Sequence, residues 1–328
     1  MQKTSQPLEI VDGITSESIL ALGDIGVYDA EHLAGLFADD DTTVSLTEYL
    51  GLSPDSVAQV RASLKNLVGE LRVADTEDLG LGALAPEEGR RRIKPVADKD
   101  TPALPPAIDL RAGFRAVRSQ GPRGTCVSFA MTALHEYKRD PAVWPDLSEQ
   151  YLYWRMKKLD GKAKACGSWL WAAARALKGF GECSEATLPY ISQLPCNNHG
   201  SIPSSAIQEA GGLRRGFAKV RISAADLRKT LALGRPVAIA IPVWKSWYTS
   251  PTVFQTGRIN MRVGKEKAVG GHALAVAGYR NGPEKGGGVF IVRNSWGSGW
   301  AYDGEFGPGY GTIPYAYINA YCWEAMTT

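Results

Sequence analysis

The sequence lacks the features that mark a membrane protein or a conventionally secreted one. No run approaches 18 apolar residues, so a membrane span is not expected. The first residues, MQKTSQPLEIVDGIT, contain neither a long apolar stretch nor a small-residue cleavage site, so no signal peptide is predicted. We therefore expect a cytoplasmic protein by default, and signal-less secretion stays open.

Cysteine and histidine are also scarce. The 328 residues include 5 cysteines and 4 histidines. An odd, modest number of cysteines without an export signal predicts mostly reduced thiols. Since histidines are so few, the partner of a reactive thiol can be sought by elimination.

What is present is the composition of a globular protein, with 44% hydrophobic and 22% charged residues. The net charge of +3 conceals an asymmetry. Residues 1–90 hold 5 Lys/Arg against 17 Asp/Glu, a balance of −12, and residues 91–328 hold 32 against 17, a balance of +15. Opposite charges attract at low salt. Two interpretations stay open: a solubilising acidic surface, or a front segment that docks on the rest of the chain as an inhibitory prodomain.

The length predicts one large domain or two unequal ones. Apolar spacing over residues 8–70 predicts a compact set of short helices, so residues 1–84 are interpreted as a small acidic all-α module that regulates or binds a partner. Residues 85–102 are rich in proline and charge, which is typical of a linker, and Arg90–Arg92 is an evident proteolysis target. The module resembles helix-hairpin-helix domains, but its charge opposes phosphate, so nucleic acid is not an expected partner.

The large domain, residues 103–328, changes character along its length. Its first half carries helical patterns such as CVSFAMTALHEYKRD, LSEQYLYWRMKKL and WLWAAARALKGFG. Its second half carries short apolar strands such as PVAIAIPV, HALAVAGYR and GGVFIVRNSWG. Helices followed by strands predict an α+β domain of two lobes.

The stretch SQGPRGTCVSFA places Cys126 where a Gly/Pro-rich turn becomes an apolar helix. In the first helical turn, unpaired backbone N–H groups and the helix dipole stabilise an anion, which predicts a lowered thiol pKa. One helix face is expected to be buried, and Asp140-Pro141 is expected to end the helix. The buried stripe comprises Val127, Ala130, Met131, Leu134 and Tyr137.

A nucleophilic thiol needs a proton-transferring partner, usually histidine. His135 lies nine residues further along the same helix as Cys126, about 13 Å away at about 1.5 Å per residue, which is too far. His32 belongs to the acidic module, and His199 lies in the loop CNNHG. His272 remains, and it opens the strand-like run HALAVAGYR behind two glycines.

A third element is the asparagine in GGVFIVRNSWGSGW. Asn294 at the end of an apolar strand can accept a hydrogen bond from an imidazole and fix its tautomer. Two adjacent antiparallel strands joined by a glycine-rich turn would bring His272 and Asn294 together. Trp296 would cover their hydrogen bond from water.

Together, SQGPRGTCVSFA, GGHALAVAGY and VRNSWGSGW resemble the papain family of cysteine peptidases, in its order Cys, His, Asn. The segments LPPAIDLR, LSEQYL and LPY extend the resemblance over about residues 103–320. It implies a two-lobed fold and an endopeptidase that forms an acyl-enzyme on protein or peptide substrates, with no metal or organic cofactor. It makes Cys126 the nucleophile, His272 the base and acid, and Asn294 its orienting partner.

The same resemblance implies further site residues. Gln120, six residues before the cysteine, would donate its side-chain amide to the oxyanion beside the Cys126 backbone N–H. Trp296 would shield the asparagine and Trp300 would line the leaving-group side of the cleft. The other cleft positions implied are Gly167 and Gly271.

Several positions depart from the family pattern. Val127 stands where the family usually has tryptophan, and Arg123 stands where many relatives have a disulfide cysteine. The glycine-rich cleft wall is reduced to ACGSWLW, and the front module does not resemble the long helical propeptide of plant and lysosomal enzymes. Two alternatives therefore stay open: an acyl-transferase or deamidase with the same triad, or a catalytically silent binding protein.

The other cysteines are weaker candidates for the nucleophile. Cys166 also precedes a predicted helix, but the residue six positions before it is Asp160 and not a glutamine. No other side-chain donor takes the place of that glutamine. Cys183, Cys196 and Cys322 are interpreted as packing residues or, after export, as disulfide partners.

Overall fold

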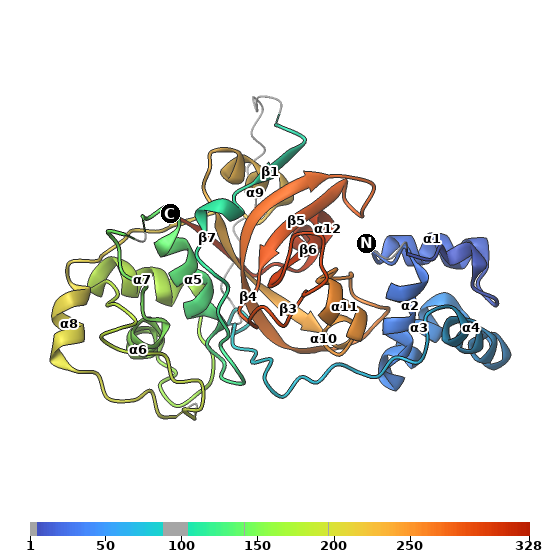
Figure 1. Ribbon diagram of the computed structural model, residues 1–328, viewed down its shortest axis with the longest axis horizontal. Helices are drawn as coiled ribbons and strands as arrows, with labels where there is room; N and C mark the ends of the chain where they lie inside the picture. The colour runs from blue at the N-terminus through green and yellow to red at the C-terminus, as the bar shows by residue number, and fades with distance from the viewer. Residues whose placement is uncertain (1–4, 88–103, 141, 196) are drawn as a thin grey trace.

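The computed structural model describes residues 5–87, 104–140, 142–195 and 197–328. Three bodies lie in a row in Figure 1: a helical lobe, a central sheet lobe and a front module of helices. The module contains α1 (Ser16–Asp24), α2 (Ala30–Phe37), α3 (Asp40–Leu50) and α4 (Pro54–Leu67), after the short 3₁₀ turn η1 (Leu8–Ile10). The helical lobe contains α5 (Cys126–Glu136), α6 (Glu149–Leu159), α7 (Leu170–Phe180) and α8 (Ser204–Ala210). The expected order of an α+β domain behind a helical module is confirmed.

The sheet lobe is built on a seven-stranded sheet within the described residues. Its strands are β1 (Ala107–Asp109), β2 (Ala218–Lys219), β3 (Val237–Trp244), β4 (Ala268–Asn281), β5 (Gly288–Arg293), β6 (Tyr310–Pro314) and β7 (Glu324–Thr327). The order is β2-β7-β3-β4-β5-β6, with β1 on β4, and every pair is antiparallel. The short helices here are η2 (Arg111–Gly113), α9 (Ala224–Ala232), α10 (Lys245–Tyr248), α11 (Pro251–Thr256) and α12 (Tyr315–Tyr321).

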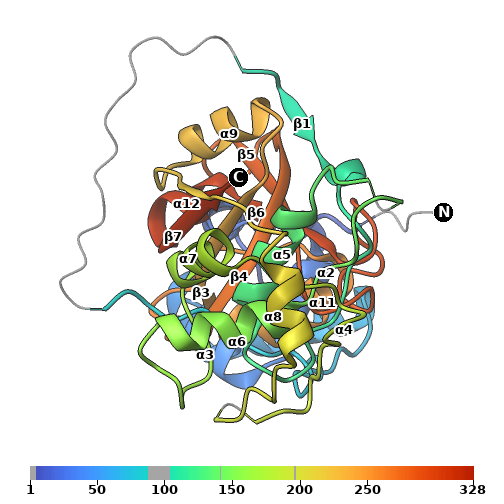
Figure 2. The same cartoon turned by 90° about the vertical axis from the view of Figure 1, so that its left-hand side faces the viewer.

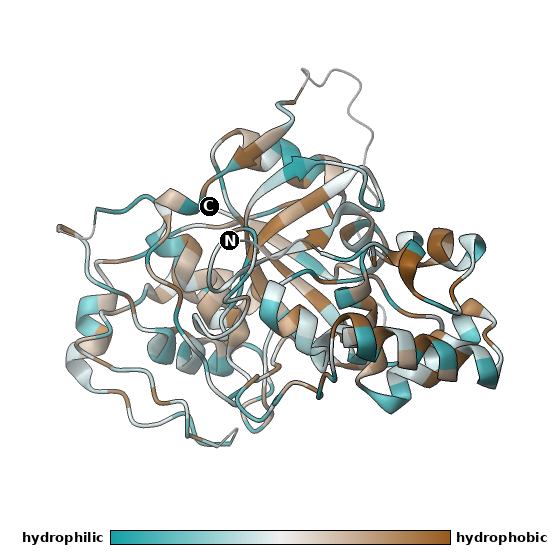
Figure 3. Ribbon diagram, turned by 45° about the vertical axis from the view of Figure 1, so that its right-hand side comes forward, coloured by the Kyte–Doolittle hydropathy of each residue, from teal (hydrophilic) through white to brown (hydrophobic). Residues whose placement is uncertain are grey.

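Large and small side chains alternate along β3 and β4, and this alternation determines how the two lobes pack together. Large side chains such as Ile239 and Leu274 point into the sheet lobe core, whereas Ala240 and Ala273 point toward α5. Successive side chains of a strand face opposite sides. Because the face toward the helical lobe carries alanine, α5 can approach the sheet closely. Hydrophobic residues accordingly concentrate in these strands (Figure 3).

Helix α5 differs from its sequence-based description in two ways. All of its residues are buried, not one stripe alone, because the sheet covers one side and α6 and α7 cover the others. The helix also ends at Glu136, earlier than expected; Pro141 lies outside the described residues. Figure 2 shows α5 to α8 grouped on one side of the sheet. No helix in the described ranges combines the length and the apolar character needed to cross a bilayer.

The helices of the module begin where capping residues stop the extended chain. The side chains of Thr15, Asp29, Asp39 and Ser53 each accept a hydrogen bond from a backbone N–H in the first turn of the helix that follows. Such caps satisfy backbone donors that a helix start leaves unpaired. The expected start at Ser53-Pro54 is confirmed.

The module packs against the sheet lobe, with α2 on α11. Ion pairs join acidic residues of the module to basic residues of the lobe: Asp24 with Lys285, Asp29 with Arg258, and both Asp39 and Asp41 with Lys245. Apolar residues of both bodies form one continuous core cluster. The contacts therefore follow the opposite net charges of the two parts of the sequence.

After α4 the chain runs extended along the lower edge of the view in Figure 1, from the module to the junction of the two lobes. We call residues 79–85 of this segment, LGLGALA, the strap. The expected module boundary at residue 84 falls within it. The expected linker, residues 85–102 with Arg90–Arg92, lies mostly outside the described residues.

Candidate active site

Cys126 is the first residue of α5 and is completely buried at the junction of the two lobes. It packs in one cluster with Ala273 of β4 and with Ala83 of the strap. Ala273 directly follows His272, so the helix start and the histidine strand meet at the thiol. Two of the three distant segments in the sequence therefore converge here.

The thiol is not the low-pKa group that its helical position predicted. Burial raises the pKa of Cys126 to about 12, outweighing backbone N–H groups of Ala273, Gly82, Val127 and Ala83 that act in the opposite direction. Two of these four groups belong to the strap. The helix terminus stabilises a thiolate only modestly, whereas removing a charge from water costs far more. Under the strap the sulfur is therefore a neutral thiol.

His272 and Asn294 are in direct contact. The Nε2 atom of His272 lies 2.7 Å from Oδ1 of Asn294, so the ring donates to the amide oxygen from this nitrogen. Its other ring nitrogen, Nδ1, is buried and has no hydrogen-bond partner, which leaves it free for proton exchange. Burial lowers the pKa of His272 to about 4, so the ring is neutral. The strand β4 begins at Ala268, so His272 lies inside it instead of opening it.

Trp296 lies on the histidine as expected. Its ring stacks on that of His272 with centroids 4.6 Å apart and planes at 29°. Trp300 meets Trp296 edge-on, with centroids 5.9 Å apart, and is 1% exposed. Trp300 therefore packs against Trp296, and Trp296 is the tryptophan that contacts the histidine.

Gln120 is held in one orientation by a residue that the sequence reading did not single out. Its Oε1 accepts a hydrogen bond of 2.6 Å from the Ser295 hydroxyl, so its Nε2 must point the other way. Nε2 donates to the carbonyl oxygens of Gly80 in the strap, at 3.0 Å, and of Arg123, at 2.7 Å. Trp296 Nε1 also donates to the Gly80 oxygen, at 3.2 Å. A peptide carbonyl of the strap thus binds the Gln120 amide, one of the two donors expected for the oxyanion.

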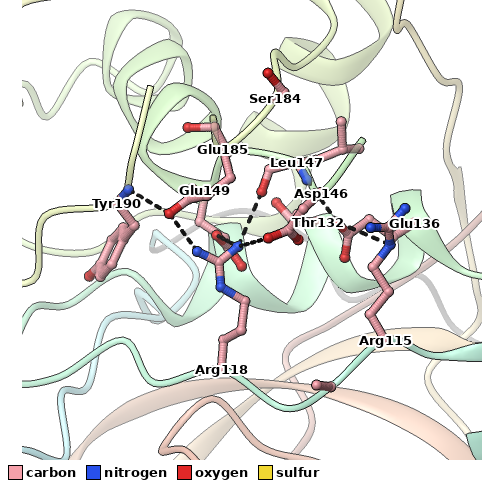
Figure 4. A network of polar contacts seen from close by, with 12 residues as sticks. Arg115, Arg118, Thr132, Glu136, Asp146, Leu147, Glu149, Ser184, Glu185 and Tyr190 are labelled. Carbon is pink, nitrogen blue, oxygen red and sulfur yellow. Dashed lines mark hydrogen bonds and ion pairs between the residues drawn. The ribbon is translucent and has the colours of Figure 1, made fainter. Parts of the chain in front are cut away.

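The chain leading to Gln120 is anchored by a charge network (Figure 4). Two residues earlier, the guanidinium of Arg118 contacts carboxylates of Asp146 at 3.2 Å, Glu149 at 3.0 Å and Glu185 at 2.6 Å. Glu149 is buried, and burial raises the pKa of its carboxyl well above the usual range. A guanidinium with several carboxylate partners is rigidly placed. The sequence signal for this anchor was LSEQYL, which includes Glu149.

The cleft walls bind the strap through backbone atoms. On the helical side, Ser168 N–H donates to the Gly82 oxygen and Leu84 N–H donates to the Ser168 oxygen, both at 2.9 Å. On the sheet side, the Gly271 oxygen accepts from Gly82 N–H at 2.9 Å and from Ala83 N–H at 3.0 Å. Main-chain hydrogen bonds of this kind add an extended peptide to a protein edge. The site accordingly holds an extended chain between its walls.

Glycines make this approach close enough. A Cβ atom on Gly271 would lie 2.2 Å from the Ala83 oxygen, and one on Gly167 would lie 2.5 Å from the Gly82 oxygen. Gly167 also has φ +78°, in the left-handed region that favours glycine. The two glycines predicted for the cleft thus line opposite walls, and each leaves room for the strap backbone.

Arg123 occupies the position where many relatives have a disulfide cysteine, and it is 3% exposed. Its guanidinium donates to Gln150 Oε1 at 2.7 Å and lies 4.8 Å from the centre of the Tyr153 ring. A buried arginine with an amide and an aromatic face can replace a covalent tie by a polar one.

The remaining cysteines are accounted for except one. Cys166 is disulfide-bonded, so it offers no thiolate. The sequence left its state open, because sequence alone does not show which sulfurs meet. Cys183 and Cys322 are free and buried. Cys196 lies outside the described residues.

The other histidines lie away from the thiol. His135 is buried in the helical lobe, with Nδ1 2.7 Å from a Glu182 carboxylate oxygen. His199 contacts the Ala163 oxygen at 2.6 Å, and His32 lies on α2 in the module.

Comparison with known proteins identifies the family of this chain. The sequence model described as papain family cysteine protease matches residues 104–312, well over half of the chain. The chain belongs to the papain family of cysteine proteases. The family prediction from the three motifs is thereby confirmed.

Relatives of known sequence are distant. Fruit bromelain of Ananas comosus is 29% identical over 215 residues, covering 63% of this chain and 55% of the relative. The peptidase C1-like protein L477 of Acanthamoeba polyphaga mimivirus is 24% identical over 215 residues, covering 61% and 64%. The match therefore spans less than two thirds of each of these relatives.

Solved structures share the fold. Xylellain, a cysteine protease from Xylella fastidiosa, superposes with a TM-score of 0.62 at 22% identity, covering 76% of this chain and 96% of that one. Procathepsin L 3 of Tenebrio molitor larval midgut superposes with a TM-score of 0.53 at 20% identity, covering 95% and 96%. The papain-like fold with a helical segment before it is confirmed.

Proposed function

We propose that this chain is a cysteine endopeptidase whose triad is Cys126, His272 and Asn294. His272 Nδ1 accepts the thiol proton, and the sulfur attacks a peptide carbonyl. The developing oxyanion receives hydrogen bonds from Gln120 Nε2 and the Cys126 backbone N–H. His272 then protonates the departing amine, and water hydrolyses the acyl-enzyme through the same histidine. Asn294 keeps the ring in the tautomer with its proton on Nε2.

One observation carries the proposal: the site already binds a peptide. The strap lies extended between the two walls, and its Gly80 carbonyl accepts the hydrogen bond from Gln120 Nε2. Backbone recognition on both sides, with little dependence on side chains, suits protein and peptide substrates of varied sequence. A binding protein would not need a histidine that Asn294 orients on the strand packed against a buried thiol.

We further propose that the acidic module and its strap inhibit the enzyme. The strap covers the thiol, and burial keeps both Cys126 and His272 neutral. If Trp300 marks the leaving-group side, as the family resemblance implies, a substrate runs from Ser168 toward Trp300 and the Trp296 ring that contacts it. The strap runs the opposite way, from Gly80 at Trp296 to Leu84 at Ser168, and Ala83 pairs with Ser168 in parallel. The peptide bonds of the strap are therefore presented backwards to the nucleophile.

The test compares thiol variants in a chain whose strap is displaced by Gly82→Ala. Cys126→Ala is expected to abolish both peptide hydrolysis and labelling by a thiol alkylator. Cys183→Ala, which removes another buried free thiol, is the matched control and should retain both. Mass spectrometry of the products distinguishes hydrolysis from acyl transfer or deamidation, because a cut chain and a modified chain differ in mass. Hydrolysis that survives Cys126→Ala would contradict the assignment.

A further inference from the structure

A buried ion pair supports the helical wall of the cleft. Lys157, near the end of α6, places Nζ 2.7 Å from the Asp160 carboxylate, and the two side chains are 1% and 0% exposed. An ion pair so fully removed from water is costly unless its remaining donors and acceptors are also satisfied. Two donors of the lysine and both carboxylate oxygens have partners, and these partners identify what the pair does.

Both charges bind the wall. Lys157 Nζ donates to the Gly167 oxygen at 2.8 Å, and the Ser168 hydroxyl donates to the Asp160 oxygen that also accepts from the lysine, at 2.8 Å. The other carboxylate oxygen accepts from Lys162 N–H at 2.8 Å. One charge therefore holds the backbone of Gly167 and the other holds the side chain of Ser168.

Ser168 is the wall residue that binds the main chain in the cleft, with its N–H on the Gly82 oxygen and its oxygen on Leu84 N–H. Lys157 and Asp160 make no hydrogen bond or ion pair to the described strap residues. Gly167 has φ +78° and no side chain, so its backbone orientation depends on hydrogen bonds to its neighbours. Besides the bond from Lys157, the Tyr153 hydroxyl accepts a hydrogen bond from Gly167 N–H at 3.2 Å.

We propose that Lys157 and Asp160 are positioning residues that aim the Ser168 backbone at the substrate main chain. This proposal rests on the proposed peptidase function and names the group that recognises the substrate on the acyl side. Charged hydrogen bonds are shorter and stronger than neutral ones, so they can hold a glycine-containing turn against the pull of different substrates. The pair acts on substrate binding through Ser168 and leaves the thiol and imidazole untouched.

The first experiment needs no hydrolysis. Hydrogen exchange in the full-length chain reports the bond from Leu84 N–H to the Ser168 oxygen. Lys157→Met is expected to lower the protection of this amide about fivefold, since one hydrogen bond contributes about 1 kcal/mol and about 1.4 kcal/mol is tenfold. The matched control is Lys158→Met, because Lys158 is the adjacent residue of the same helix and is exposed. Unchanged protection in a folded Lys157→Met chain would overturn the proposal.

The second experiment measures hydrolysis in the Gly82→Ala background. A peptide is compared with an analogue in which only the bond that carries the N–H donated to the Ser168 oxygen is an ester. The scissile peptide bond is the same in both substrates. The enzyme should favour the peptide over the ester about fivefold in kcat/KM, the value of one hydrogen bond. Lys157→Met should raise KM for the peptide, leave kcat unchanged and bring the ratio of peptide to ester kcat/KM near one. Equal losses on both substrates, with the ratio kept, would mean a structural role alone and contradict the proposal.

A neutral double variant covers the case in which a lone buried charge prevents folding. Lys157→Met with Asp160→Asn leaves neither charge, so it should fold and still lose the discrimination between peptide and ester. If this variant keeps the full ratio of about fivefold between peptide and ester, the pair does not position Ser168. If no variant in any background, including the parent, cleaves either substrate, the proposed function fails, while the hydrogen-exchange result still decides the role of the pair.

Discussion

The substitution Gly82→Ala is expected to turn the covered enzyme into an active one. A Cβ on Gly82 would lie 2.2 Å from the Gly124 oxygen and 2.3 Å from its carbonyl carbon. Both are backbone atoms of the turn before Cys126, so no flexible side chain can yield. Real Cβ contacts are essentially never below 3.0 Å, so the strap must move by about 0.8 Å or more.

Such a shift removes most of the central strap contacts. Four backbone hydrogen bonds of 2.9 to 3.0 Å join residues 82–84 to Ser168 and Gly271, and lengthening them by about 0.8 Å takes them beyond hydrogen-bond range. At about 1 kcal/mol each, their loss destabilises the covered state by about 3 to 4 kcal/mol. The open state contains no such clash, so its population relative to the covered state should rise by a factor of about 10² to 10³.

The assay is the initial rate of cleavage of a peptide substrate, together with the rate of alkylation of Cys126, in full-length chains. Both rates should rise in Gly82→Ala. Gly179→Ala is the matched control, since its added Cβ would meet no atom within 4 Å. If Gly82→Ala is folded and both rates stay at the level of the parent chain, the strap does not limit access and the reasoning is refuted.

Three further outcomes are expected. Burial, and after it the charge of Arg258, lowers the pKa of His32 to about 3. The docked module therefore binds fewer protons than the free module, whose histidine has the ordinary pKa of about 6.5. Docking should then weaken about tenfold for each pH unit below about 6.5. Peptidase onset in a pH series measures this, and His32→Gln should shift the onset to lower pH; an unchanged onset would exclude His32. Ser295→Ala should lower kcat about two- to tenfold, because the Gln120 side chain loses the hydrogen bond that fixes its orientation. Circular dichroism should show an unchanged fold, and a kcat equal to that of the parent would show that the hydroxyl is dispensable. The peptidase activity of the full chain should rise with salt concentration, because salt screens the ion pairs that hold the module. The Gly82→Ala chain is the reference for other effects of salt on the rate. A rate that does not rise with salt relative to this reference would contradict electrostatic docking.

Much of the site was readable from the sequence because each part is a local pattern. Glycines and a threonine before an apolar helix indicated where Cys126 begins α5, and an apolar strand ending in Asn294 indicated its place at the end of β5. The capped helices of the module were readable for the same reason, since Ser53 followed by proline is a local helix-start signal. These predictions needed only a few residues on either side.

The strap was not readable in this way. LGLGALA has no helical pattern, so residues 79–84 were assigned to the module and no contact with the cleft was predicted for them. Its conformation is fixed by partners far along the chain, Ser168 and Gly271. The pair of Lys157 and Asp160 was hidden for a similar reason, because a charge near a helix end usually faces solvent.

The sequence by itself determined which residues are candidates for the chemistry, through the family motifs, their order and the helix and strand that present them. Only the tertiary structure decided the state of that chemistry. A first-turn cysteine is expected to have a lowered pKa, yet the pKa of Cys126 is raised to about 12, because the strap and both lobes remove it from water. Burial depends on everything that packs around an atom, whereas a motif records only its neighbours along the chain.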